Sequence, residues 1–175
     1  MESLTNRKII SVNQKLGFEI GAQDTLRTVF DTVTTSRSRF SFFRDFSGKT
    51  NLEANVNRNK LDSEETMVIQ EILLTQESLG GIVFDGFAIL NAVIGNQRVI
   101  KDLPVQFETA PGLQSYPVKH LTAKYISLPM ISQIVIPPDT EFEVTLEVQK
   151  KAIADTKVKC VLVGYGRLYN SNTSF

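Results

Sequence analysis

The chain holds few of the side chains on which enzyme chemistry usually depends. It has one histidine, His120, and one cysteine, Cys160, in 175 residues. Catalytic triads rely on a histidine between a nucleophile and an acid, and zinc sites draw on several cysteines and histidines. A cysteine-based zinc cluster and a disulfide framework are therefore excluded, and little remains for a histidine-based triad. We predict a protein that is not an enzyme, with no catalytic residues, metal or cofactor.

Two local motifs could suggest other chemistry. Phe46–Thr50 reads FSGKT, like the end of a phosphate-binding loop, but that motif needs another glycine five positions before Gly48, where Phe43 stands. Asp62, Glu64 and Glu65 form an acidic cluster, whereas paired-carboxylate catalysis needs groups held across a cleft. We interpret the first as a polar turn and the second as a solvated loop.

The most unusual stretch is 35–49, where basic and aromatic residues alternate. Arg37, Arg39 and Arg44 are interleaved with Phe40, Phe42, Phe43 and Phe46. Arginines beside aromatic rings can hold single-stranded nucleic acid by phosphate pairing and base stacking. The alternative is that the rings enter a core or a subunit contact while the arginines pair with acidic groups of a neighbour. Four phenylalanines in seven positions favour packing or assembly.

Charge is balanced over the chain but unevenly distributed along it. Lys and Arg number 19, as do Asp and Glu, and 42% of residues are hydrophobic, which indicates an ordinary globular domain. The first 60 residues hold ten basic against six acidic groups. This excess predicts a basic N-terminal arm over residues 1–50, followed by one domain over 51–175. No apolar stretch approaches the ~20 residues of a membrane span, and we expect a cytosolic chain with a reduced thiol.

One segment of the arm has helical spacing. Leu26, Val29, Phe30 and Val33 follow the i, i+3, i+4, i+7 pattern, and Asp24 or Thr25 could cap the start. We predict a short amphipathic helix over about 22–35. Its apolar stripe would cover an open end of the fold or dock on a neighbour.

From about Thr66 the period of the apolar residues changes to two. The clearest case is Glu141–Gln149, where Phe142, Val144, Leu146 and Val148 alternate with polar residues. Phe87–Ile94 and Gln97–Ile100 flank Gly95-Asn96 and predict a hairpin. The other predicted strands are Thr66–Leu74, Val105–Glu108, Leu121–Ser127, Ile131–Ile136 and Lys157–Val163. About eight strands with short Gly- and Pro-containing connections predict a sandwich, jelly roll or barrel.

Three features together resemble a family. They are the run from Thr50-Asn51-Leu52 through Asn59-Lys60-Leu61 to Met67–Ile72, the turn Ile136–Asp139, and the strand Phe142–Val148. Over about residues 50–150 this pattern resembles the jelly-roll capsid and virion structural proteins of bacterial viruses. The resemblance implies an eight-stranded antiparallel jelly roll with an N-terminal arm that assembles as a symmetric homo-oligomer within an icosahedral shell.

On that basis we expect a capsid component located in the virion and made in the host cytoplasm. Its partners would be copies of itself, other virion proteins and, as a further candidate, packaged nucleic acid bound by the basic arm. Leu26, Val29, Phe30 and Val33 are the expected docking residues of the arm. Arg37, Arg39 and Arg44 are the expected contacts to acidic partners or nucleic acid. Two alternatives stay open: a receptor- or carbohydrate-binding spike or fibre head, and a single-stranded nucleic-acid-binding protein.

Overall fold

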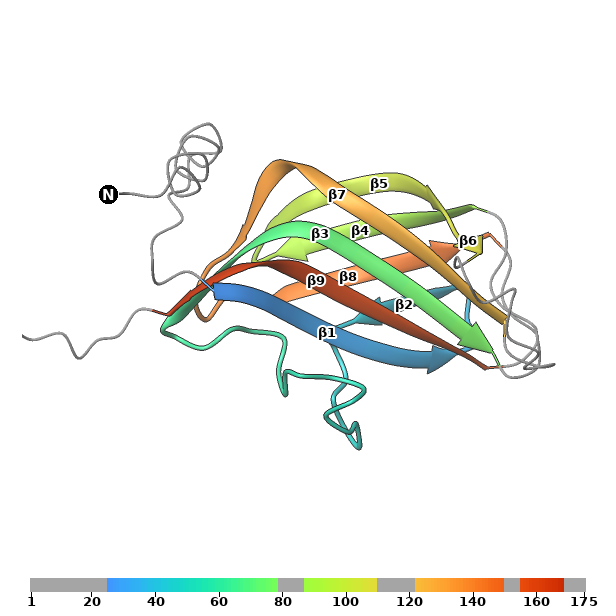
Figure 1. Cartoon of the computed structure of the whole chain (residues 1–175), viewed down its shortest axis with the longest axis horizontal. Helices are drawn as coiled ribbons and strands as arrows, with labels where there is room; N and C mark the ends of the chain where they lie inside the picture. The colour runs from blue at the N-terminus through green and yellow to red at the C-terminus, as the bar shows by residue number, and fades with distance from the viewer. Residues whose placement is uncertain (1–24, 79–86, 110–121, 150–154, 169–175) are drawn as a thin grey trace, which may run out of the picture.

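A computed structural model describes residues 25–78, 87–109, 122–149 and 155–168 of the chain. Within these ranges the backbone forms nine β-strands and no helix (Figure 1). The strands are β1 (Thr25–Thr35), β2 (Arg39–Phe42), β3 (Glu65–Ser78), β4 (Phe87–Ile94), β5 (Gln97–Gln106), β6 (Glu108–Thr109), β7 (Thr122–Ile136), β8 (Phe142–Val148) and β9 (Thr156–Leu168). The prediction of an all-β fold is therefore confirmed.

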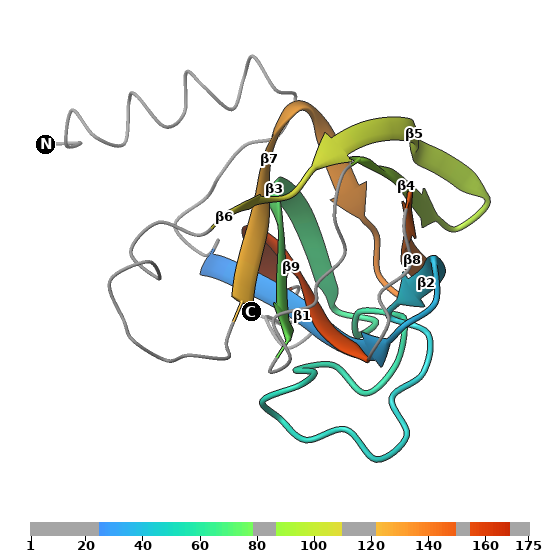
Figure 2. The ribbon, with the colours of Figure 1, turned by 90° about the vertical axis from the view of Figure 1, so that its right-hand side faces the viewer.

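The strands form two antiparallel sheets. One sheet has the order β1-β9-β3-β7-β6 and the other the order β2-β8-β4-β5. The turned view shows the two sheets as facing layers (Figure 2). A single cluster of buried apolar side chains, which includes Ile72 and Leu74 of β3, Leu90 of β4 and Leu146 of β8, fills the space between them. The arrangement is a β-sandwich.

Strand β8 shows why the alternating pattern gives this fold. Phe142, Val144, Leu146 and Val148 are buried, while Glu147 is exposed. Residues two apart in a strand point to the same face, so one face of β8 joins the core and the other meets solvent. The hairpin around Gly95 is also confirmed, and its second strand, β5, extends beyond the predicted end at Ile100 to Gln106.

The centre of the larger sheet contains an irregularity that depends on a glycine. Relative to β9, strand β3 carries one extra residue between Ile69 and Glu71, and the pairing with β7 is interrupted at the same place, where the partner changes from Ile134 to Pro129. A Cβ atom on Gly164 of β9 would lie 1.8 Å from the carbonyl oxygen of Val68. The extra residue lies in β3, and Gly164 of β9 makes room for it.

The predicted helix over 22–35 is wrong, because Thr25–Thr35 is strand β1. Residues 22–24 lie outside the described part of the chain. Seven of the eleven residues of β1 are Thr or Val, and β-branched side chains are poorly suited to helices and favoured in strands. Strand β9 pairs with β1 along its whole length, from Gly166 opposite Thr25 to Thr156 opposite Thr35. This partner decides the structure of the segment.

As a consequence, the four apolar residues of the predicted helix do not share a face. In a strand, Val29 and Val33 point to one side and Leu26 and Phe30 to the other. Val29 is fully buried in the core and Val33 packs against it. Leu26 is 73% exposed, and the ring of Phe30 lies under the Lys159 ammonium group. The predicted docking stripe is therefore divided between the core and the outer surface.

Strands β1 and β2 lie within residues 1–50, the range that we predicted as an arm. Strand β1 is part of the larger sheet and β2 is part of the smaller one, so the sandwich already includes residues 25–42. Only residues 1–24 of the predicted arm precede the sandwich, and they lie outside the described ranges.

Candidate functional site

The long connection between β2 and β3 is attached to the sandwich by a buried aspartate. Asp31 lies in β1 with no exposed surface, and its carboxylate accepts hydrogen bonds from the backbone N–H groups of Thr32 (2.9 Å) and Phe43 (2.7 Å). Lys49 Nζ donates a third hydrogen bond at 2.5 Å. Phe43 adopts a positive φ of 62°, an uncommon conformation for a bulky residue, and its ring packs against Phe142. This network fixes where the connection leaves β2.

A second attachment covers the outer edge of β1. The Asn55 side chain accepts a hydrogen bond from Phe30 N–H (2.8 Å) and donates one to the Thr28 carbonyl (2.7 Å), and Asn55 N–H donates to the Phe30 carbonyl. The amide thus imitates a neighbouring strand. Because exposed strand edges can pair with other chains, this contact removes a stretch of β1 from such pairing.

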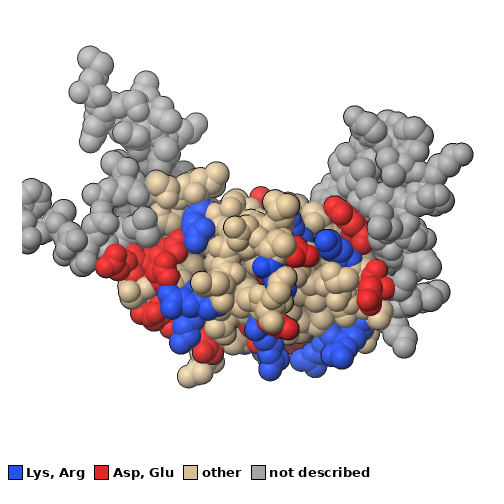
Figure 3. All heavy atoms as spheres, turned by 90° about the horizontal axis from the view of Figure 1, so that it is seen from below, with Lys and Arg blue, Asp and Glu red and all other residues tan. Residues whose placement is uncertain are grey.

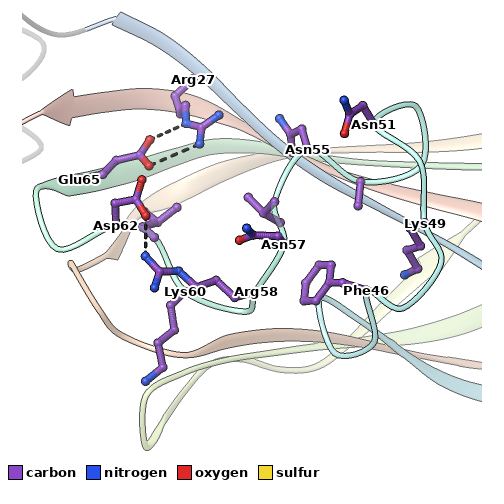
Figure 4. A pocket seen from close by; sticks show the side chains of 13 residues that line it. Arg27, Phe46, Lys49, Asn51, Asn55, Asn57, Arg58, Lys60, Asp62 and Glu65 are labelled. Carbon is purple, nitrogen blue, oxygen red and sulfur yellow. Dashed lines mark hydrogen bonds and ion pairs between the residues drawn. The ribbon is translucent and has the colours of Figure 1, made fainter.

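Between these attachments and the start of β3 lies a hollow of about 440 Å³, which we call the connection hollow. Figure 4 shows its side chains. At one end Arg27 Nε donates to Glu65 at 2.5 Å and Arg27 Nη2 to the second oxygen at 3.4 Å. Arg58 pairs with Asp62 at 2.5 Å. The predicted solvated acidic loop is thus wrong for Glu65, which is buried in this bidentate pair.

A larger and more open hollow of about 840 Å³ lies beside the end of β1, and we call it the arginine hollow. The three arginines singled out in the sequence, Arg37, Arg39 and Arg44, all line it and are exposed. Arg44 lies 4.0 Å from Glu143, whereas Arg37 and Arg39 make no ion pair with any described residue. Asp45 and Asp155 line the same hollow, so its charge is mixed. On the face in Figure 3, Lys and Arg side chains gather at the lower right, while acidic side chains lie at both the left and the right with basic ones among them.

The phenylalanines among these arginines belong to the sandwich. Phe42 and Phe43 are fully buried, Phe40 is nearly so, and Phe46 is half-buried against the core. The packing interpretation is confirmed for these rings. A ring inside the core cannot stack on a nucleic-acid base, so Phe40, Phe42 and Phe43 are not available for the contact that the single-strand-binding hypothesis requires, whereas Phe46 keeps part of its ring exposed.

Apolar side chains are exposed on the outer face of the smaller sheet. Phe87 is 60% and Ile89 41% exposed on β4, and Ile89 lies between Pro104 of β5 and Glu147 of β8. At the other sheet, Ile131 of β7 is almost completely exposed. Contiguous exposed apolar surface is typical of protein–protein contacts.

Among the remaining sequence candidates that the structure describes, Cys160 lies in an environment that suppresses thiol reactivity. Cys160 is buried, and its pKa is raised well above the ordinary value, first by burial and then by the nearby Asp31 carboxylate. Thiol reactivity needs the thiolate, so this cysteine is inert in the folded protein. His120 lies outside the described residues. The FSGKT segment is a turn with Gly48 at φ 71°, as expected, although its lysine is engaged with Asp31.

Sequence reasoning missed Asp31 and Asn55, the two residues that hold the connection. The available signal was an aspartate in the middle of a β-branched run, where a charged side chain needs a partner if the run forms a buried strand. Within the described ranges, no group of three or more His, Cys, Asp or Glu side chains could hold a metal ion. Those ranges also contain no helix of the length and apolarity that crossing a bilayer requires.

Comparison with known proteins assigns the chain to no family. No protein-family model matches the sequence, and a search of curated proteins returns no match. The class that the described residues define is an all-β sandwich of two antiparallel sheets.

Proposed function

We propose that the sandwich is a single jelly roll. The supporting observation is the strand order. One sheet contains β1, β9, β3 and β7 side by side and the other β2, β8, β4 and β5, so the chain changes sheets at nearly every connection. Eight strands arranged as two Greek keys in two sheets define a jelly roll, and the two-residue β6 only extends one edge.

On this fold we place the function of a structural virion protein, a shell component of a bacteriophage that acts without catalysis. Jelly rolls recur in viral capsids, and the strand order is the one observation that carries this analogy. It agrees with the family resemblance of residues 50–150. The protein would act through its surface, in symmetric contacts between copies.

Two regions of the surface support such contacts. The outer face of the smaller sheet presents Phe87 and Ile89, which would lose water contact in an interface. The arginine hollow presents Arg37 and Arg39, which have no ion-pair partner within the described chain and could meet acidic groups of a neighbour. A specific interface needs roughly 1,000 Å² of buried surface, so both regions and the N-terminal residues would contribute.

The test is the assembly state of the full chain. Sedimentation velocity and negative-stain electron microscopy should detect large closed particles or a symmetric oligomer that is their building block. Ile89→Lys should reduce assembly and leave the melting temperature of the sandwich nearly unchanged. The control is Ser63→Lys, at an exposed position in the β2–β3 connection outside both regions, and it should change neither assembly nor the melting temperature. A protein that stays monomeric at every concentration would contradict the proposal. A stable trimer that never forms particles would favour the spike or fibre head.

A further inference from the structure

The connection hollow has features of a small-molecule site that shell assembly does not use. Its volume of about 440 Å³ lies within the usual range of ligand pockets, roughly 300–1,000 Å³. Segments far apart in sequence surround it, namely β1, the β2–β3 connection and the start of β3 (Figure 4). The chemical class of its ligand follows from which of the polar side chains that line it are already paired and which are not.

The cations of the hollow are already neutralised. Each of the four basic side chains has an acidic partner within 4 Å. The pairs are Arg27–Glu65 (2.5 Å), Lys49–Asp31 (2.5 Å), Arg58–Asp62 (2.5 Å) and Lys60–Glu141 (3.6 Å). An anion bound here would have to compete with these carboxylates. The hollow is therefore polar but electrostatically compensated, which favours a neutral ligand.

Two amides remain available. The side chains of Asn51 and Asn57 make no hydrogen bond to any described residue, and Figure 4 shows Asn57 near the middle of the hollow with the ring of Phe46 beside it. An amide offers a carbonyl acceptor and two N–H donors, which match hydroxyl groups that both donate and accept. An aromatic ring provides an apolar surface for the C–H groups of a ligand.

The walls of the hollow are held in place before any ligand arrives. Asn55 joins the connection to β1, Lys49 joins it to Asp31, and the Asn59 carbonyl accepts a hydrogen bond from Phe142 N–H at 2.9 Å. A site whose polar groups are already positioned loses little conformational entropy on binding.

From these observations we infer that the connection hollow binds a neutral sugar, held by the amide of Asn57 against the Phe46 ring, with the Asn51 amide lining the same hollow. The inference does not depend on shell assembly, because the hollow lies within one chain and is complete in a monomer.

The test uses the full chain and four probes, glucose, galactose, mannose and N-acetylglucosamine, with inorganic phosphate as the charged comparison. Isothermal titration calorimetry and ligand-observed NMR should show weak, saturable binding of at least one sugar and none of phosphate. Asn57→Ala should weaken that binding about tenfold, as expected for the loss of one or two hydrogen bonds. Gln106→Ala, an exposed amide outside the hollow, and Arg37→Ala in the arginine hollow should leave it unchanged.

Circular dichroism of each variant verifies that the sandwich is intact. Three results would overturn the inference: no binding of any of the four sugars, sugar binding that Asn57→Ala leaves unchanged in a folded protein, or tighter binding of phosphate than of the sugars. None of these results bears on particle formation, so the proposed shell function would be judged separately.

Discussion

Lys49 Nζ and the buried carboxylate of Asp31 lie 2.5 Å apart, and this pair connects the first strand of the sandwich to the long β2–β3 connection. The lysine side chain keeps 18% of its surface exposed, whereas the aspartate has none. The cost of burying the aspartate charge is offset by the lysine and by two backbone N–H donors. The connection therefore depends on one charged side chain within the core.

Lys49→Met should destabilise the protein by about 2–3 kcal/mol, because it leaves the Asp31 charge buried with only its backbone donors. Urea unfolding followed by circular dichroism measures the change. Arg44→Met is the control, because Arg44 is exposed and 4.0 Å from its acidic neighbour, and it should change stability by less than about 0.5 kcal/mol. Equal losses of stability in the two variants would show that the buried Lys49–Asp31 pair contributes no more to stability than the exposed pair of Arg44.

Gly164→Ala should be among the most damaging small substitutions, with a loss of about 3 kcal/mol or more, because its Cβ would overlap the Val68 carbonyl oxygen in the centre of the larger sheet. Gly166→Ala is the matched control. Its added methyl would lie 3.0 Å from Arg27 Cβ and 3.1 Å from Arg27 Cγ, a tight contact without overlap with the backbone, so we expect a smaller loss than for Gly164→Ala. Similar melting temperatures for the two variants would mean that the β3 bulge does not require a glycine opposite it.

Glu53 should contribute to acid sensitivity. Its pKa lies below the ordinary value of 4.5, first because its carboxylate accepts a hydrogen bond from the Thr50 backbone N–H, and also because of the Thr50 hydroxyl and Lys157. A carboxyl group with a lowered folded-state pKa stabilises the protein above its unfolded pKa, and this contribution is lost as the pH falls through the folded value. Glu53→Gln should therefore reduce the loss of stability on acidification below about pH 5. Unfolding curves measured from pH 6 to acid would test this, and identical pH dependence of the two proteins would contradict it.

Cys160 should resist thiol reagents in the native state, because burial and the Asp31 carboxylate both raise its pKa. Labelling with Ellman's reagent at mildly alkaline pH should be slow in buffer and rapid in denaturing urea. Rapid stoichiometric labelling of the folded protein would show that β9 is more accessible than its complete burial indicates.

Two truncations separate the contribution of the N-terminal residues from that of the sandwich. Deletion of residues 1–24 should leave the melting temperature nearly unchanged, because β1 begins at Thr25, and under the proposed function it should impair particle formation. Deletion of residues 1–34 should prevent stable folding, because it removes nearly all of the strand that covers β9. Circular dichroism and electron microscopy measure the two effects. A folded 1–34 deletion would contradict the place of β1 in the sheet, and normal particles from the 1–24 deletion would contradict a role of the N-terminal residues in assembly.

The sequence by itself determined the all-β class, the alternation of β8 and the hairpin at Gly95. A strand with one buried face has an apolar residue at every second position, and this pattern can be seen within a few consecutive residues. The sequence also indicated that the phenylalanines between Arg37 and Phe46 pack inside. It did not determine the structure of β1. Leu26, Val29, Phe30 and Val33 would share one face of a helix, but in a strand the same four residues lie on two opposite faces. Only the pairing with β9, more than 120 positions later, decided the outcome.

The tertiary structure alone brought the candidate sites together. Arg27 of β1 meets Glu65 of β3, Lys49 reaches Asp31, and Asn55 closes the edge of β1. These contacts join segments 18 to 38 residues apart, and no local pattern marks them. These contacts form because a buried charge or an open strand edge needs a polar partner. Which residue becomes that partner depends on the topology, which decides the polar group that lies nearby in the folded chain.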